Sequence, residues 1–167
     1  GLDVFLDLKL HDIPRTAAAA AAQAGALGVR LITVHAAGGG AMVRAVRDAI
    51  DVRTAVIAVT VLTSLSAAAV HALGVQEDLS AWAVRLARMA RDHGADGLVC
   101  SAHELAALAS LGGHRVVPGV RPLGSPADDQ QRTATASDAV RAGATWIVVG
   151  RPIVQAPDPR EAARALN

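Results

Sequence analysis

The chain has 167 residues, 52% of them hydrophobic, and its 16 basic and 15 acidic residues leave a formal net charge of +1. This length and composition can form one sizeable hydrophobic core. The nearly balanced charge argues against a basic patch for nucleic acid or for an anionic membrane surface. No apolar run approaches the roughly 20 residues that span a bilayer, and the only cysteine, Cys100, cannot form an intrachain disulfide. We therefore expect a cytoplasmic protein that binds neither nucleic acid nor membranes.

Short β-branched apolar runs alternate with alanine-rich helical patterns along the chain. The apolar runs predict strands over residues 4–8, 31–35, 55–62, 97–100, 115–118 and 146–149. The patterns between them predict helices over residues 15–26, 41–50, 79–93, 102–110 and 137–142. A last helix is predicted from residue 160 onward, with Asp158 as its cap and Pro159 in its first turn. The predicted strands are apolar throughout rather than alternating, which is typical of a parallel sheet covered by helices.

These patterns give six strand–helix units with no composition break, so we expect one α/β domain over residues 1–167. Each unit takes about 28 residues, and eight units would need roughly 220, near the size of a small (β/α)8 barrel. We therefore predict a TIM barrel of which this chain holds strands three to eight, with two N-terminal units missing. Six strands alone would leave two unpaired sheet edges. The alternative is a complete, smaller, doubly wound sheet.

Asp7 and Lys9 lie at the end of the first predicted strand. Because they are two residues apart, their side chains should point to the same face of the strand, with Leu6, Leu8 and Leu10 facing the covering helix. Opposite charges that face a barrel interior are costly unless they are paired and functional. Lys9 is the only lysine in the chain, and a lysine can give up a proton where an arginine cannot.

Asp12 follows in the loop, two residues before the proline that opens the next helix. One interpretation of this segment is structural: Asp7 and Lys9 form an ion pair, and Asp12 caps the helix. The other is catalytic, because the spaced triple Asp-x-Lys-x-x-Asp is more specific than any pair within it. Barrel enzymes place their active sites at the carboxyl ends of the strands, which favours the catalytic interpretation.

Two arginines follow the last two predicted strands. Arg121 lies in the loop after residues 115–118, and Gly150 and Arg151 come directly after residues 146–149. Barrels often bind phosphate at the loops after strands seven and eight, and arginine suits bidentate phosphate binding. Glycine lets the backbone approach a ligand closely, although a Gly-Arg pair can also be an ordinary surface turn. The two arginines together predict a phosphate site.

The run from Asp7 to Thr16 resembles the signature of the orotidine 5′-monophosphate decarboxylases. The resemblance implies that Lys9 protonates C6 of the pyrimidine as carbon dioxide leaves and that Asp7 sits against the substrate carboxylate. It also implies that Asp12 reaches into the site of a second subunit, which makes the protein a homodimer. The run departs from the family at Arg15, where asparagine is common.

The resemblance continues in order through nearly the whole chain. It implies substrate-binding roles for Asp7, Lys9, Asp12, Ile13, Thr16, Thr63, Arg121, Gln130, Gly150 and Arg151. The polar loop over residues 123–132 is then expected to be a lid over the phosphate, with Asp128 where glycine is usual. The family's ribose-binding aspartate and second lysine come from two earlier strands, and neither residue lies in this chain.

The resemblance implies decarboxylation of orotidine 5′-monophosphate to UMP, the last step of de novo pyrimidine biosynthesis, with no metal or cofactor. One alternative is a magnesium-dependent sugar-phosphate decarboxylase or synthase of the same superfamily, and another is an inactive fragment that only binds uridine nucleotides. The residues after Asp12 and the set of Arg121, Gln130 and Arg151 favour the nucleotide enzyme. We interpret His35 and Cys100 as packing residues, and no histidine has the spacing of a metal ligand.

Overall fold

The computed structural model describes residues 2–121 and 134–166. A single parallel sheet of six strands runs through them in the order β1-β2-β3-β4-β5-β6, so each strand pairs with its neighbour in sequence. The strands are β1 (Phe5–Leu10), β2 (Leu31–His35), β3 (Ala55–Val59), β4 (Gly97–Val99), β5 (His114–Val117) and β6 (Trp146–Ile147). A doubly wound sheet would reverse its strand order at a switch point, and this one does not. The curled sheet therefore corresponds to six consecutive units of a (β/α)8 barrel, as predicted.

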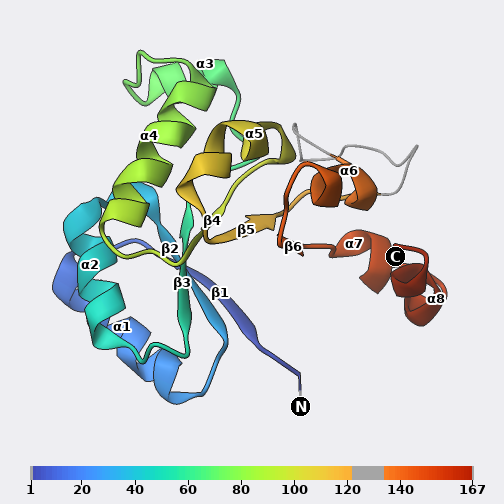
Figure 1. Ribbon diagram of the computed structural model, residues 1–167, viewed down its shortest axis with the longest axis horizontal. Coiled ribbons are helices and arrows are strands. Elements are labelled where there is room, and N and C mark those ends of the chain that lie inside the picture. The colour runs from blue at the N-terminus through green and yellow to red at the C-terminus, as the bar shows by residue number, and fades with distance from the viewer. Residues whose placement is uncertain (1, 122–133, 167) are drawn as a thin grey trace.

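Helices follow the strands and cover the outer face of the sheet (Figure 1). The α-helices are α1 (Pro14–Ala26), α2 (Gly40–Ala49), α3 (Ala67–Ala72), α4 (Leu79–Asp92), α5 (Leu105–Leu108), α6 (Ala136–Arg141), α7 (Arg151–Val154) and α8 (Pro159–Arg164). Three 3-10 turns are η1 (Ala36–Gly38), η2 (Ala102–Glu104) and η3 (Ala109–Leu111). In Figure 1, α1, α2 and α4 gather beside the first strands, while α7 and α8 lie beyond β6 near the C-terminus. None of the described helices combines the length and apolar content needed to cross a lipid bilayer.

Side-chain caps explain where several helices begin. The side chains of Asp78 and Asp158 accept hydrogen bonds from backbone N–H groups at the starts of α4 and α8. Ser66 and Thr135 do the same for α3 and α6. Each cap satisfies a backbone donor that has no partner within its helix. The predicted cap of the last helix at Asp158 is thus confirmed.

Both faces of the sheet are apolar, but they pack against different partners. The outer face, including Ile32 and Val34 of β2, joins the main core beneath the helices. On the inner face, Leu31, Ile57 and Val116 form a second, smaller cluster. Alternate residues of one strand therefore enter different apolar layers, which explains why the strands read as continuously hydrophobic.

The structure corrects several details of the predicted elements. The strand predicted over 55–62 ends at Val59, so residues 60–62 lie outside the strand. Two short helices, α3 and α7, were not predicted, since four to six residues carry too little periodicity to be recognised. Leu8 is 49% exposed rather than packed beneath the covering helix, because β1 is irregular at that point.

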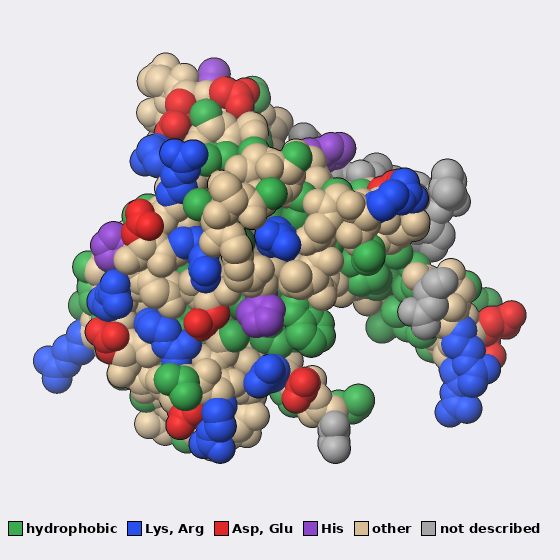
Figure 2. Space-filling model, in the orientation of Figure 1, with side chains coloured by type: hydrophobic (Ala, Val, Ile, Leu, Met, Phe, Trp, Pro, Cys, Tyr) green, Lys and Arg blue, Asp and Glu red, His purple; other side chains and the backbone are tan. Residues whose placement is uncertain are grey.

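Charged side chains are spread over the surface. On the face drawn in Figure 2, Lys and Arg side chains (blue) lie scattered among Asp and Glu side chains (red) rather than forming one basic area. This distribution agrees with the formal net charge of +1.

Candidate active site

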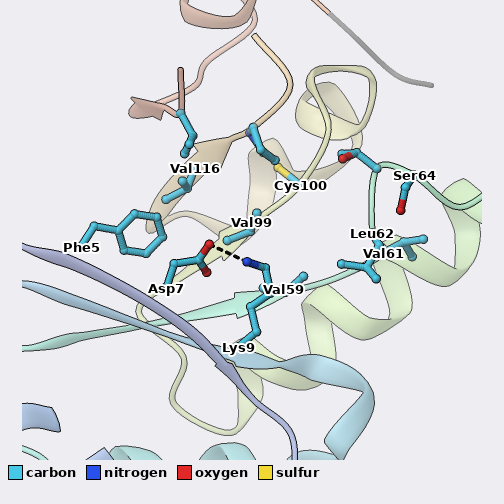
Figure 3. A pocket seen from close by; sticks show the side chains of 13 residues that line it. Phe5, Asp7, Lys9, Val59, Val61, Leu62, Ser64, Val99, Cys100 and Val116 are labelled. Atoms are coloured by element: carbon cyan, nitrogen blue, oxygen red, sulfur yellow. Dashed lines mark hydrogen bonds and ion pairs between the residues drawn. The ribbon is translucent and has the colours of Figure 1, made fainter. Parts of the chain in front are cut away.

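A cavity of about 210 Å³ opens at the carboxyl ends of the strands, where barrel enzymes place their active sites. Its lining residues are Phe5, Asp7, Lys9, Val59, Val61, Leu62, Thr63, Ser64, Val99, Cys100, Val116, Pro118 and Val148. Figure 3 shows Asp7 and Lys9 pointing toward one another within it, beside Phe5, Val59 and Val99. Two opposite charges therefore face a cavity whose remaining walls are largely hydrophobic.

Asp7 and Lys9 form a close ion pair. The Nζ atom of Lys9 lies 2.5 Å from Oδ2 of Asp7. The side chains of Lys9 and Asp7 are 41% and 45% exposed, so the pair is open to the cavity rather than sealed in the core. Ion pairs this exposed typically contribute only about 0–1 kcal/mol to folding. The pair is therefore better placed to act on a bound molecule than to hold the fold together.

The strand that carries this pair is distorted where the pair lies. Pairing with β2 advances from Leu6 to Leu10 on β1 but only from Ile32 to Val34 on β2, so β1 bulges between these points. Lys9 has a φ of 50°, and it is the only non-glycine residue with positive φ in the described part of the chain. Bulges are frequent beside active sites, where they redirect a side chain. The sequence pattern predicted the shared face of Asp7 and Lys9 but not this bulge.

Two histidines lie beside the pair without lining the cavity. The rings of His11 and His35 have centroids 5.3 Å apart and an interplanar angle of 40°. Burial lowers the pKa of His35, electrostatic interactions with His11 and Lys9 lower it further, and Asp7 opposes them. A lowered pKa favours the uncharged imidazole at neutral pH. His35 thus packs next to the site without adding a second positive charge to it.

Asp12, Ile13 and Thr16 lie apart from the cavity in this chain. Asp12 is exposed, and its Oδ1 accepts a hydrogen bond of 2.7 Å from the backbone N–H of Ile13. The interpretation of Asp12 as the helix cap is wrong, because Ile13 occupies that position and α1 has no side-chain cap. Its start relies on Pro14 in the first turn. Within the described residues, Lys9 forms its ion pair with Asp7.

The predicted phosphate residues follow strands whose ends reach the cavity. Pro118 and Val148 line it, and the chain continues from them to Arg121 and to Gly150. The backbone N–H of Arg121 donates to the carbonyl of Ala134 at 3.0 Å. The Nε atom of Arg121 is buried. The loops that carry both predicted arginines therefore begin at the rim of one cavity.

Arg151 begins α7, and Gly150 precedes it as the N-cap residue. A Cβ placed at Gly150 would meet no atom within 4 Å, so the space beside this backbone is open. Gly150 has a φ of −102°, so it lies outside the positive-φ region. Gln130, Asp128 and the expected lid over residues 123–132 lie outside the described residues.

Thr63, which was predicted to contact substrate, is among the residues that line the cavity, and the hydroxyl-bearing Ser64 lies beside it. The sequence interpretation missed Ser64, and it also missed Thr33, which is fully buried and contacts both members of the ion pair. Thr33 stands two residues after Leu31 on β2, at an inward position that is otherwise apolar. A lone polar residue at such a position was the available signal.

The described residues contain no group of three or more His, Cys, Asp and Glu side chains arranged to hold a metal ion. The chemical groups that line the cavity are one ammonium, one carboxylate, hydroxyls, the thiol of Cys100 and an apolar wall.

The chain closely resembles known proteins over nearly its whole length. A family model described as "Orotidine 5'-phosphate decarboxylase / HUMPS family" matches residues 1–166. A protein named orotidine 5'-phosphate decarboxylase from Anaeromyxobacter dehalogenans is 56% identical over 169 residues, covering 99% of this chain and 74% of that protein. One of the same name from Nitrosomonas europaea is 48% identical over 171 residues, covering all of this chain and 74% of that protein.

Solved structures agree with these relatives. The crystal structure of orotidine 5'-phosphate decarboxylase from Lactobacillus acidophilus superposes with a TM-score of 0.86 at 35% sequence identity, covering 99% of this chain and 74% of that one. The enzyme of the same name from Pyrococcus horikoshii OT3 gives a TM-score of 0.76 at 28% identity, covering 99% and 73%. With the family model and relatives of this identity in agreement, the chain belongs to the orotidine 5'-phosphate decarboxylase / HUMPS family.

Proposed function

We propose that this chain catalyses the decarboxylation of orotidine 5′-monophosphate to UMP, with Lys9 as the proton donor and no metal or cofactor. The observation that carries the proposal is the ion pair of Asp7 and Lys9, which points into a largely apolar cavity at the carboxyl ends of the strands. The reaction belongs to pyrimidine biosynthesis. We place it in the cytoplasm and in a single partial-barrel domain over residues 1–167.

Asp7 contributes an electrostatic repulsion with the substrate that disappears as the reaction proceeds. Its carboxylate would face the carboxylate of the substrate, and like charges in a cavity of low polarity repel strongly. When the bond between C6 and the carboxyl carbon breaks, carbon dioxide leaves uncharged and the repulsion disappears. Interactions that are better in the transition state than in the ground state are the ones that accelerate a reaction.

Lys9 supplies the charge and the proton. The bond electrons stay on C6 of the pyrimidine, and the nearby ammonium stabilises the carbanion that develops there. The ammonium then donates a proton to C6, giving UMP and a neutral amine that is reprotonated from water. The ion pair with Asp7 holds the ammonium in position before substrate binds. Arginine could not replace Lys9, because a guanidinium does not release its proton at ordinary pH.

The other end of the substrate would be held by its phosphate. Arg121, Gly150 and Arg151 follow neighbouring strands whose ends reach the cavity. Gln130, which lies outside the described residues, is expected to complete this set. Thr63 would contact the nucleotide from the cavity wall. Binding energy from such a remote group can be used at the reacting carbon, especially when it closes a loop.

We further propose that the protein acts as a homodimer. Asp12, Ile13 and Thr16 are exposed at the start of α1, outside the cavity of their own chain, so they are available to the site of a second copy. An inactive Lys9→Ala chain mixed with an inactive Asp12→Ala chain should then regain part of the activity, because one site in a mixed dimer has both residues. Mixtures that stay inactive would count against a shared site.

The function is tested by decarboxylation of orotidine 5′-monophosphate, followed by its ultraviolet absorbance, for the wild type and for Lys9→Ala. The wild type should form UMP, and Lys9→Ala should lose turnover while UMP binding, measured by calorimetry, largely survives. Near-wild-type turnover in Lys9→Ala would refute the role of Lys9. UMP binding by the wild type without any turnover would favour a nucleotide-binding fragment instead.

A chelator separates the proposal from the magnesium-dependent sugar-phosphate enzymes of the same superfamily. Added EDTA should leave decarboxylation of orotidine 5′-monophosphate unchanged. Activity that disappears with EDTA and returns with magnesium would contradict the metal-free reaction.

A further inference from the structure

We infer that Thr33 is a positioning residue, whose hydroxyl holds the bulge of β1 in the form that aims both Asp7 and Lys9 into the cavity. The inference deepens the proposed function and rests on it. Thr33 is not among the residues that line the cavity, so it acts through its two neighbours.

One hydroxyl group of Thr33 makes two hydrogen bonds across the strands. The backbone N–H of Lys9 donates to Oγ1 of Thr33 at 2.8 Å. The same Oγ1 donates to Oδ1 of Asp7, also at 2.8 Å. Thr33 is fully buried, so water cannot readily take over either bond. A single side chain on β2 thus fixes both the backbone of the proton donor and the carboxylate beside it.

The bond to Lys9 matters because its backbone is strained. A φ of 50° is unfavourable for any residue with a Cβ, and it persists only where the surroundings impose it. Inside a regular parallel ladder the N–H of Lys9 would bond to a carbonyl of the next strand. Here the bulge replaces that carbonyl with the Thr33 hydroxyl.

The bond to Asp7 fixes the orientation of its carboxylate. Oδ1 of Asp7 is bound to Thr33 and Oδ2 to Lys9, so the two oxygens have different partners and the group cannot rotate freely. Without the Thr33 hydroxyl, both groups would stay in the cavity but would lose their fixed relative geometry. A misplacement of about 1 Å in a reacting group can cost roughly 100-fold in rate.

Three variants test the inference. Thr33→Val keeps the shape and removes the hydroxyl, and Thr33→Ser keeps the hydroxyl. Thr54→Val is the matched control, because Thr54 is also buried and its Oγ1 donates to the carbonyl of Val29, away from the cavity. Circular dichroism and thermal unfolding of each variant establish that it folds.

The first measurement does not depend on activity. Because Lys9 is the only lysine, protein labelled with ¹⁵N-lysine gives a single backbone amide signal, and its hydrogen-exchange rate reports the bond to Thr33. Exchange should be at least about tenfold faster in Thr33→Val and close to wild type in Thr33→Ser and Thr54→Val. An exchange rate unchanged in Thr33→Val would overturn the inference.

The second measurement separates positioning from binding. In Thr33→Val, kcat for orotidine 5′-monophosphate should fall by about tenfold or more while KM changes little, and Thr33→Ser should recover most of the rate. A wild-type kcat in Thr33→Val, or an equal loss in Thr54→Val, would overturn the positioning role. If the wild type has no turnover at all, the proposed function fails, and the exchange measurement still decides whether Thr33 holds the bulge.

Discussion

Replacing Lys9 by glycine and by alanine gives a direct test of the strained bulge. Both substitutions remove the ammonium and its exposed ion pair, so the difference between them comes from the backbone, in the folded chain from a φ of 50° and in the unfolded chain from conformational freedom. Holding a residue with a Cβ in the left-handed region costs about 1–2 kcal/mol, and glycine avoids this cost. Glycine also gains about 0.5–1 kcal/mol of freedom in the unfolded chain, which offsets part of the difference. Lys9→Gly should therefore be more stable than Lys9→Ala by roughly 0.5–1 kcal/mol.

The assay is equilibrium unfolding in urea or by heat. In the thermal experiment, a difference of 1 kcal/mol shifts the midpoint temperature of a chain this long by about 2–4 °C. Leu8 supplies the control, because it is adjacent, 49% exposed and outside the positive-φ region. There the order should reverse, with Leu8→Gly less stable than Leu8→Ala. A Lys9→Gly protein that is no more stable than Lys9→Ala would refute the left-handed backbone at Lys9.

Three further outcomes are expected. Arg151→Ala should weaken binding of UMP but hardly change binding of uridine, because the lost contact is to phosphate; calorimetry with both ligands checks this. Arg47→Ala should lower the free energy of unfolding by about 2–3 kcal/mol, because Arg47 binds Asp96 at 2.6 Å and several backbone carbonyls. The free energy of unfolding should fall as the pH drops below about 6.5, because His35 has a lower pKa in the folded chain and therefore binds a proton more tightly in the unfolded chain. His35→Gln should flatten this dependence, which urea titrations at several pH values check.

Each of these outcomes has a contrasting result. Equal losses of UMP and uridine binding in Arg151→Ala would indicate a misfolded loop rather than a phosphate contact. Arg53→Ala, which removes an arginine whose side chain is 86% exposed, should leave stability almost unchanged. If Arg53→Ala lost as much free energy of unfolding as Arg47→Ala, the greater contribution expected from the more buried arginine would be contradicted. Stability that rises as the pH falls below about 6.5 would reverse the sign derived for His35.

Much of the fold follows from local sequence. The apolar runs that became β2 and β5 alternate with helical patterns at the spacing of strand–helix units, and this spacing was enough to predict a sequential parallel barrel. The start of α8, where Asp158 is the N-cap residue, also followed from a local signal. Such features depend on residues close together in the chain, so a pattern can reveal them.

The details of the candidate site depend on contacts between distant residues. The pattern predicted that Asp7 and Lys9 share a face, but the bulge depends on Thr33, 24 residues after Lys9. The same bulge exposes Leu8, which simple alternation placed beneath the helix. Asp12 had a typical capping position, yet the helix starts with proline and needs no side-chain cap. Long-range hydrogen bonds of this kind override local preference and leave little trace in the sequence.

The small cluster of Leu31, Ile57 and Val116 lies on the inner face of the sheet. Val116, together with Phe5, borders both the candidate active site and a second hollow nearer the opposite end of the strands. Apolar side chains therefore lie between the ion pair of Asp7 and Lys9 and the amino ends of the strands. At the amino ends of the strands, a polar surface hollow is lined by residues that include Arg30, Asp51 and Arg53. Labels, tethers or stabilising substitutions introduced there would lie at the other end of the strands from the candidate active site, so this end of the protein is the natural place to engineer it.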